Sequence, residues 1–221
     1  MNQIAIVAGA TGLVGSSLLN QLLDDPYFTK VISISRRDSG IKHTKLSEFI
    51  GPLDDVTFLK NHIKGDILFC CLGTTIKKAG SREAFKKVDL EIPVLIAKIA
   101  SENQVPAICV VSSIGANANG SNFYLQTKGE MENEILNLGF EKTTIVRPSM
   151  LLGNRKEFRL GEEIGKLVMI PSNYLLFGRF KKYRAIKGET VSRAMINIQK
   201  RNISGKIFES DQLEKYGSNI L

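Results

Sequence analysis

The feature that most constrains the fold is the alternation of short apolar runs, rich in β-branched residues, with longer segments of helical periodicity. The short runs are apolar throughout, a pattern typical of strands that are buried on both faces of a parallel sheet. Together the runs and the helical segments predict an α/β fold, with a doubly wound parallel sheet between helices. Strands are expected at residues 3–9, 30–35, 56–59, 66–73, 106–113 and 142–149.

The rhythm weakens after residue 150. In doubly wound folds a C-terminal excursion of this kind tends to lie over the carboxyl ends of the strands, where ligands bind. We therefore expect residues 1–221 to form a single domain, in which the part after about residue 150 adds a substrate-side cap. Within that part we expect helices at 158–170 and 189–201, an irregular basic connection at 171–188, and a short strand at 206–210.

Composition restricts the class of protein. A hydrophobic content of 43% and a charged content of 24% are ordinary for a globular protein and exclude disorder and collagen-like repeats. The start of the sequence lacks a basic region before its apolar run, so we expect no secretion signal. Apolar stretches stay shorter than the roughly 18 residues of a membrane span. The three cysteines lie inside apolar runs and favour a reducing, cytoplasmic location.

The chain is basic, with a net charge of +8 and a pI near 9.4. The basic residues occur in small groups and not along one helix with interleaved aromatic residues, so we expect no nucleic-acid partner and no membrane partner. A phosphate-bearing small ligand is compatible with this charge. A homo-oligomer is also compatible with the sequence, which contains no signal for one.

A glycine-rich turn, GATGLVG, follows the first predicted strand and opens the first predicted helix. Glycines at this spacing allow a tight turn, close approach of backbone N–H groups to a diphosphate, and close packing of helix on strand. The turn predicts a dinucleotide-binding loop and hence a Rossmann-type fold, the alternative being a merely tight turn. The candidate contacts are Gly9, Thr11, Gly12, Leu13, Val14 and Gly15.

The end of the second predicted strand, SISRRDSG, indicates which cofactor binds. NAD sites place an acidic residue here to bind the ribose 2′-hydroxyl, whereas NADP sites place basic residues. Arg36 and Arg37 suit a 2′-phosphate, and Asp38 lies beyond them in the predicted turn. NADP is therefore preferred over NAD, the alternative being that the arginines are solvated strand-end charges.

The helix predicted at 124–136 carries a lysine on its apolar stripe. Lys128 shares this stripe with Tyr124, one turn earlier, and with Met131, Ile135 and Leu138. A buried ammonium group costs free energy unless it has partners, although a lysine can also extend its head group to solvent. Next to Tyr124 the charge would favour the phenolate, as general acid or base chemistry requires. Ser112 and Ser113 end the preceding strand and could hold a carbonyl beside the phenol.

Together the glycine turn, a strand-end serine and Y-x-x-x-K resemble the short-chain dehydrogenase/reductase superfamily, in its extended or atypical branch, over residues 3–150. The segment VRPS at 146–149 is similar to that branch's R-P segment. Within the branch, four segments resemble the Tat-interacting-protein family of atypical reductases, known in animals as metastasis-suppressor proteins. They are CCLGTT (70–75), KAG (78–80), VSSIGA (111–116) and NFYLQTKGE (122–130).

The resemblance implies roles for particular residues. Ser113 would orient the carbonyl or alcohol, Tyr124 would exchange its proton, and Lys128 would bind the nicotinamide ribose and favour the phenolate. Ser112 is a rival for the serine role, because adjacent strand residues point to opposite faces. The N-A-G segment of the commoner enzymes is replaced by CLGTT, so their proton relay is not carried over. Further cofactor contacts would be Leu72, Gly73, Thr74, Ser112, Pro148 and Ser149.

These features predict an NADP-dependent oxidoreductase that transfers a hydride between nicotinamide and a small carbonyl or alcohol. The alternatives are an NAD(P)H-binding regulator that senses redox state without turnover and, less favoured because of the arginine pair, a nucleotide-sugar epimerase that uses NAD. No metal site is expected, because Cys70 and Cys71 are adjacent and point apart. Cys109 lies mid-strand, which argues against a thiol nucleophile. Glu130, Glu132 and Glu134 are interpreted as a solvated helix face, partly paired with neighbouring lysines.

Overall fold

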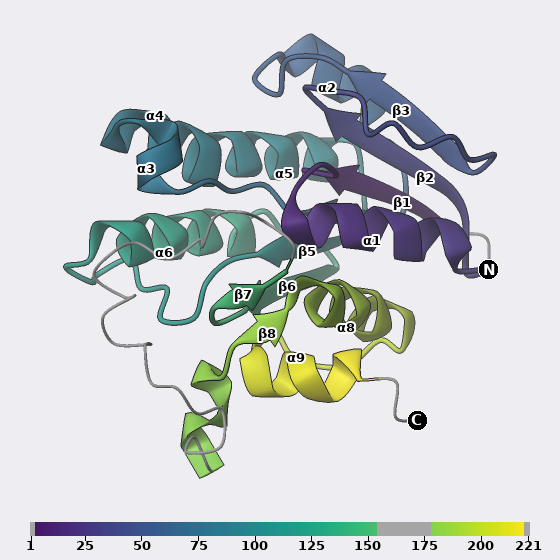
Figure 1. Ribbon diagram of the computed structural model, residues 1–221. Helices are drawn as coiled ribbons and strands as arrows, with labels where there is room; N and C mark the ends of the chain where they lie inside the picture. Colours follow the sequence, from purple (N-terminus) through teal and green to yellow (C-terminus); the bar gives the residue numbers. More distant parts are fainter. Residues whose placement is uncertain (1–2, 154–177, 219–221) are drawn as a thin grey trace.

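A computed structural model describes residues 3–153 and 178–218. Its main sheet has seven parallel strands in the order β3-β2-β1-β4-β5-β6-β9 (Figure 1). The chain winds outward from β1 in one direction and then from β4 in the other, which confirms the predicted doubly wound, Rossmann-type fold. The strands are β1 (Gln3–Ala8), β2 (Phe28–Ser35), β3 (Leu46–Ile50), β4 (Ile67–Cys70), β5 (Ala107–Val111), β6 (Lys142–Arg147) and β9 (Ile207–Glu209).

Helices cover both faces of this sheet (Figure 1). One face packs against α1 (Leu13–Asp24), α8 (Gly188–Lys200) and α9 (Ser210–Gly217). The other packs against α2 (Val56–His62), α5 (Ile92–Glu102) and α6 (Phe123–Leu136). The central strands are buried on both sides, because helices occupy both faces, and this accounts for their continuously apolar sequences. The shorter elements are α3 (Ile76–Ala79), α4 (Arg82–Lys86), the π-helical turn η1 (Lys87–Glu91), the 3₁₀ helix η2 (Gly178–Tyr183), β7 (Leu151–Leu152) and β8 (Ile186–Lys187).

On the β3 side of the sheet one predicted strand is wrong and one strand was not predicted. Residues 56–59 form the start of helix α2 and not a strand, because the Asp55 carboxylate accepts a hydrogen bond from the Phe58 N–H (3.0 Å) and caps the helix. The strand next to β2 is β3, which is only half-buried and lacks a long apolar run. The helix predicted at 189–201 and the strand at 206–210 are confirmed as α8 and β9. The helix predicted at 158–170 lies outside the described residues.

The helical segment between β4 and β5 contains a π-helical turn, η1, just before α5. Pro93 has no N–H to donate to the carbonyl of Asp89, and in a regular α-helix its ring would crowd that carbonyl. The wider π turn removes this conflict. The side chain of Asp89 is buried there, and this position becomes important in the candidate site.

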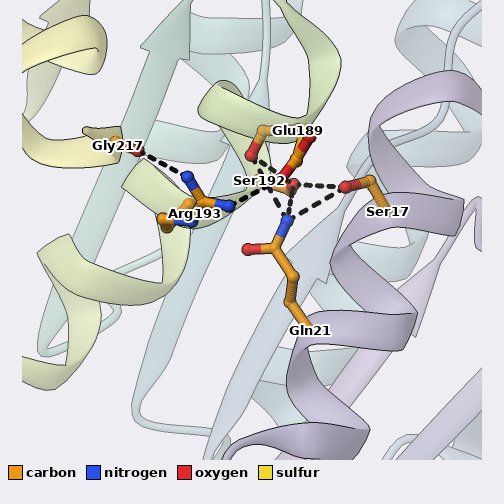
Figure 2. A network of polar contacts seen from close by, with 6 residues as sticks. All are labelled: Ser17, Gln21, Glu189, Ser192, Arg193 and Gly217. Carbon is orange, nitrogen blue, oxygen red and sulfur yellow. Dashed lines mark hydrogen bonds and ion pairs between the residues drawn. The ribbon is translucent and has the colours of Figure 1, made fainter. Parts of the chain in front are cut away.

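A polar network holds α8 against α1 (Figure 2). Gln21 on α1 donates to Ser192 Oγ on α8 (2.8 Å), and Ser192 Oγ lies 2.9 Å from Ser17 Oγ. Arg193 extends the network to the last turn of α9 by donating to the Gly217 carbonyl (3.2 Å). The helix that follows the glycine turn is therefore anchored to the C-terminal part of the fold. Across both described ranges, no helix is long and apolar enough to span a bilayer.

Candidate functional site

The glycine turn between β1 and α1 brings backbone segments closer together than residues with a side chain would allow. Gly9 has φ +89°, and a Cβ there would lie 2.8 Å from the backbone of Cys71. A Cβ at Gly15 would lie 2.1 Å from the Gly9 carbonyl oxygen, so α1 can approach β1 this closely only with glycine. No side chain caps the first turn of α1, and none of its residues there is acidic. Its N-terminal N–H groups and dipole therefore suit an anion, and the turn fits a dinucleotide.

The two arginines lie beside this turn, because β2 neighbours β1 in the sheet. Arg36 and Arg37 directly follow the last residue of β2, and both are exposed. The Asp38 carboxylate accepts a hydrogen bond from the Gly40 N–H (2.7 Å), which lowers the pKa of this carboxyl and keeps it within the turn. Asp38 is exposed as well, but its carboxylate is engaged by its own turn.

A cavity of about 260 Å³ lies at the carboxyl ends of β4, β5 and β6, next to the glycine turn along the same sheet edge. It brings together all the candidates from the second half of the predicted site. Its lining includes Leu72, Gly73, Thr74, Ser112, Ser113, Tyr124, Lys128, Pro148 and Ser149. The lining also contains residues that were not predicted, namely Asp89, Val111, Ile114, Gly115, Leu125, Met150, Leu151 and Tyr183.

Lys128 is buried, with 4% of its surface exposed, so the alternative in which it extends to solvent is wrong. Its Nζ lies 2.8 Å from Asp89 Oδ1, and Asp89 is itself only 1% exposed. The other carboxylate oxygen of Asp89 accepts a hydrogen bond from the Thr74 N–H (2.7 Å). A carboxylate partner offsets the desolvation cost of the ammonium and explains how the helix tolerates a buried lysine.

Asp89 is the main site residue that the sequence interpretation missed, although a signal was present. The buried positions on this helical segment include Phe85, Asp89, Pro93 and Ile96, at helical spacing. An acidic residue on an apolar stripe poses the same question as Lys128 on its own stripe. Lys128 and Asp89 can both be buried because each charge has the other as its partner.

Tyr124 lies in the first turn of α6, where the Asn122 side chain caps the helix by accepting from the Leu125 N–H (3.1 Å). Its ring packs 5.5 Å from that of Phe85, measured between centroids. Ser112 Oγ is buried and has no hydrogen-bond partner among the described residues, whereas Ser113 Oγ makes a long contact (3.4 Å) with the Ile114 carbonyl. Both serines therefore line the cavity with hydrogen-bonding capacity for a ligand.

The interpretation of the α6 glutamates as a solvated face is wrong for Glu132. This residue is buried, and its carboxylate accepts hydrogen bonds from the Arg147 guanidinium at the end of β6 (Nε to Oε1 2.9 Å). The bond raises the pKa of Arg147. Glu130 is half-buried and pairs with Lys86 (3.2 Å). The Glu132–Arg147 pair fixes α6 to β6 immediately before Pro148.

The cysteines are core residues. Burial raises the pKa of Cys70 to about 11 and that of Cys109 to about 12, so both stay protonated near neutral pH. Cys109 is completely buried in mid-sheet, which confirms its interpretation as a core residue rather than a nucleophile.

Comparisons with known proteins agree with this geometry. A family model described as NAD(P)H-binding matches residues 9–167. The protein FMP52, mitochondrial, of Candida albicans is 35% identical over 208 residues, covering 91% of this chain and 90% of the relative. Protein HTATIP2 of Rattus norvegicus is 31% identical over 202 residues, covering 89% and 81%.

Solved structures support the fold. The enzyme WbmH of Bordetella bronchiseptica, in complex with NAD+, superposes with a TM-score of 0.71 at 14% identity, over 95% of this chain and 75% of that one. A UDP-glucose 4-epimerase of Thermotoga maritima, with UDP-glucose, gives 0.66 at 16% identity, over 96% and 80%. At these identities the likeness shows the fold alone.

The prediction of a cytoplasmic location is wrong in the light of the relatives, because the FMP52 proteins are named as mitochondrial. Buried free thiols do not distinguish the cytoplasm from another reducing compartment. The family itself follows from the extent of the matches and from the glycine turn, the strand-end serines and the Y-x-x-x-K pair on one sheet edge. The chain belongs to the NAD(P)H-binding family and is an atypical short-chain dehydrogenase/reductase related to HTATIP2.

Proposed function

We propose that this protein is an NADP-dependent oxidoreductase that interconverts a small carbonyl compound and its alcohol. The observation that carries the proposal is the convergence of Tyr124, Lys128 and the two strand-end serines on one cavity beside the glycine turn. The order of the strands arranges the candidate contacts along one edge, from the arginines after β2 through the turn after β1 to the cavity after β4, β5 and β6. An extended dinucleotide suits such a row of contacts.

In the reductive direction, NADPH when bound supplies a hydride to the carbonyl carbon. Tyr124 donates its phenolic proton to the carbonyl oxygen, which becomes the hydroxyl of the alcohol, and regains a proton from solvent. Lys128 binds the ribose next to the nicotinamide and stabilises the phenolate that remains after proton transfer. The reverse sequence oxidises the alcohol.

We assign the two serines different roles. Ser113 orients the substrate carbonyl, in keeping with the resemblance to the superfamily. Ser112, whose buried hydroxyl lacks a partner among the described residues, donates to the cofactor. Ser113→Ala is then expected to lower kcat/KM for the substrate, whereas Ser112→Ala is expected to raise the Kd for NADPH. The opposite result would mean that Ser112 orients the substrate and Ser113 contacts the cofactor.

The preference for NADP is supported by the exposed Arg36 and Arg37 and by the position of Asp38 within its own turn. The names of the FMP52 relatives support a mitochondrial location, which imaging of the tagged protein would test. We also propose that the region from about residue 150 onward caps the substrate side of the cavity. Among the described residues of this region, Met150, Leu151 and Tyr183 line the cavity.

Tyr124→Phe tests the function. Turnover of a carbonyl substrate is expected to fall by roughly 100- to 10,000-fold, because the proton donor is lost. The Kd for NADPH is expected to stay within about threefold, since the hydroxyl acts on the substrate and not in cofactor binding. Tyr216→Phe, which removes a hydroxyl on α9 outside the cavity lining, is the matched control.

Three outcomes would contradict the proposal. Unchanged turnover in Tyr124→Phe would remove the tyrosine from the chemistry. Tight NADPH binding without consumption of NADPH, across a panel of aldehydes and ketones, would favour a redox-sensing regulator with the same fold. Recovery of bound NAD after denaturation would instead favour an epimerase.

A further inference from the structure

The buried Asp89–Lys128 pair is an unusual element of the cavity, because it places a full negative charge beside the lysine that is proposed to bind the cofactor. Asp89 Oδ1 forms an ion pair with Lys128 Nζ (2.8 Å) without hydrogen-bond geometry, and Oδ2 accepts a hydrogen bond from the Thr74 N–H (2.7 Å). These partners lie on different elements, since Lys128 is on α6 and Thr74 is in the turn that follows β4. One side chain therefore joins two walls of the cavity.

The surroundings of the pair are closely fitted to it. A Cβ at Gly73 would lie 3.1 Å from Asp89 Oδ1 and 3.6 Å from Lys128 Nζ, so the turn after β4 rests directly on the two charged groups. The π-helical turn η1 carries Asp89, and such turns are frequent at functional sites. At 4% exposure, the lysine is confined to this enclosed setting.

We propose, on the basis of the proposed function, that Asp89 is a positioning residue that holds the Lys128 ammonium and the Gly73–Thr74 turn in the relative arrangement needed at the nicotinamide end of the cofactor. It acts through the lysine and not on the substrate. Without the carboxylate, the ammonium loses its partner on this wall, and the lysine no longer has a fixed position relative to Tyr124 and the cofactor ribose.

Asp89→Asn is the sharpest test because it keeps the size of the side chain. The amide oxygen can still accept from the Thr74 N–H, but the NH₂ group then meets the ammonium donor to donor. Turnover is expected to fall by roughly 10- to 100-fold, the effect of a small misplacement of a catalytic group, while the Kd for NADPH stays within about threefold. Asp54→Asn is the matched control, because it removes an exposed carboxylate that pairs with Lys87, on the same π turn.

A double-mutant cycle separates positioning from a general structural role. If Asp89 acts only through Lys128, Asp89→Asn adds no further loss of turnover to Lys128→Met, whereas independent roles would multiply the two losses. The double variant is also expected to be more stable to heat than either single variant, because neither charge is then buried without its partner. Multiplying losses, or wild-type turnover in Asp89→Asn, would overturn the proposal.

The fluorescence of saturating NADPH provides a readout that needs no substrate. Asp89→Asn and Lys128→Met are expected to change the emission of bound NADPH in the same way, and the double variant is expected to match Lys128→Met. Emission of Asp89→Asn equal to that of the wild type would overturn the positioning role, even if no carbonyl is reduced and the proposed function fails. If Asp89→Asn does not fold, the double variant is compared with Lys128→Met. Equal NADPH emission in these two variants supports the positioning role, and different emission overturns it.

Discussion

At the end of β2 the candidate cofactor site presents Arg36 and Arg37 to solvent, whereas at the ends of β4 to β6 it encloses Lys128 and Asp89 as a buried pair. Salt in the solvent screens the attraction between exposed charges and a ligand, and exposed side chains can move to fit the ligand. Buried, bonded charges have fixed positions before any ligand arrives. The first region is thus suited to selecting a cofactor and the second to aligning reacting groups. The glycine turn joins the two.

Gly15→Ala should have the largest effect, because it alters the backbone that both regions share. Its Cβ would lie 2.1 Å from the Gly9 carbonyl oxygen, so the turn or α1 must shift. We expect the Kd for NADPH to rise by at least about 100-fold and the free energy of unfolding to fall by roughly 1–3 kcal/mol, as for other overpacked sites.

Isothermal titration calorimetry and urea denaturation measure these two effects. Gly139→Ala is the control, because Gly139 lies in a turn after α6 with positive φ (+74°), and a Cβ there would meet no atom within 4 Å. It is expected to cost stability without changing the Kd. Wild-type affinity in Gly15→Ala would mean that the turn does not bind the diphosphate and that the two regions do not share one ligand.

The double substitution Arg36→Ala and Arg37→Ala should have the next largest effect and should be confined to the exposed region. Loss of charged hydrogen bonds to a 2′-phosphate is expected to raise the Kd for NADPH by roughly 10- to 100-fold and to leave the Kd for NADH unchanged. Calorimetry with both cofactors at low and high salt checks the effect, which salt should diminish.

Lys30→Ala, which removes an exposed charge from β2 itself, controls for the general field of a basic protein. A wild-type preference for NADH over NADPH would contradict the assignment of the arginines. An equal loss of affinity for NADPH and NADH would show that Arg36 and Arg37 contribute to cofactor binding but do not distinguish NADPH from NADH.

Cys70, at the end of β4, tests the buried region, and its effect is smallest near neutral pH because it appears only as the thiol ionises. Its folded-state pKa of about 11 lies above the ordinary value of 9.0, so the folded state retains the proton more strongly than the unfolded state does. Stability linked to this thiol is complete below about pH 9 and is lost as the pH rises toward 11. A shift of this size corresponds to roughly 2–3 kcal/mol.

Urea denaturation near pH 8 and near pH 10.5 would measure this loss, and Cys70→Ala should lose less stability over that interval by about 2 kcal/mol. The difference between the two proteins isolates Cys70 from the lysines, the tyrosines and Cys109. An identical loss in both proteins would mean that the thiol already contacts solvent, so that the buried region is more open than its geometry indicates.

Local sequence predicted those parts of the molecule that depend on near neighbours in the chain. Apart from β3 and α2, the order of the main strands and helices and the glycine turn followed from periodicity and spacing, because backbone hydrogen bonding and steric limits act over a few residues. The prediction of a strand at 56–59 was wrong because a single carboxylate cap at Asp55 outweighs a short apolar run. Glu132 was misplaced because its partner, Arg147, comes from another element.

By itself, the sequence determined the doubly wound fold, the dinucleotide turn, and the presence of a tyrosine and a lysine on one helix face. Only the tertiary structure decided what surrounds that lysine. Asp89 contacts both Lys128 and Thr74 because α6, the π turn and the end of β4 meet at one sheet edge. The free energy of a buried charge depends on such long-range neighbours, and these arise only when the whole sheet has assembled.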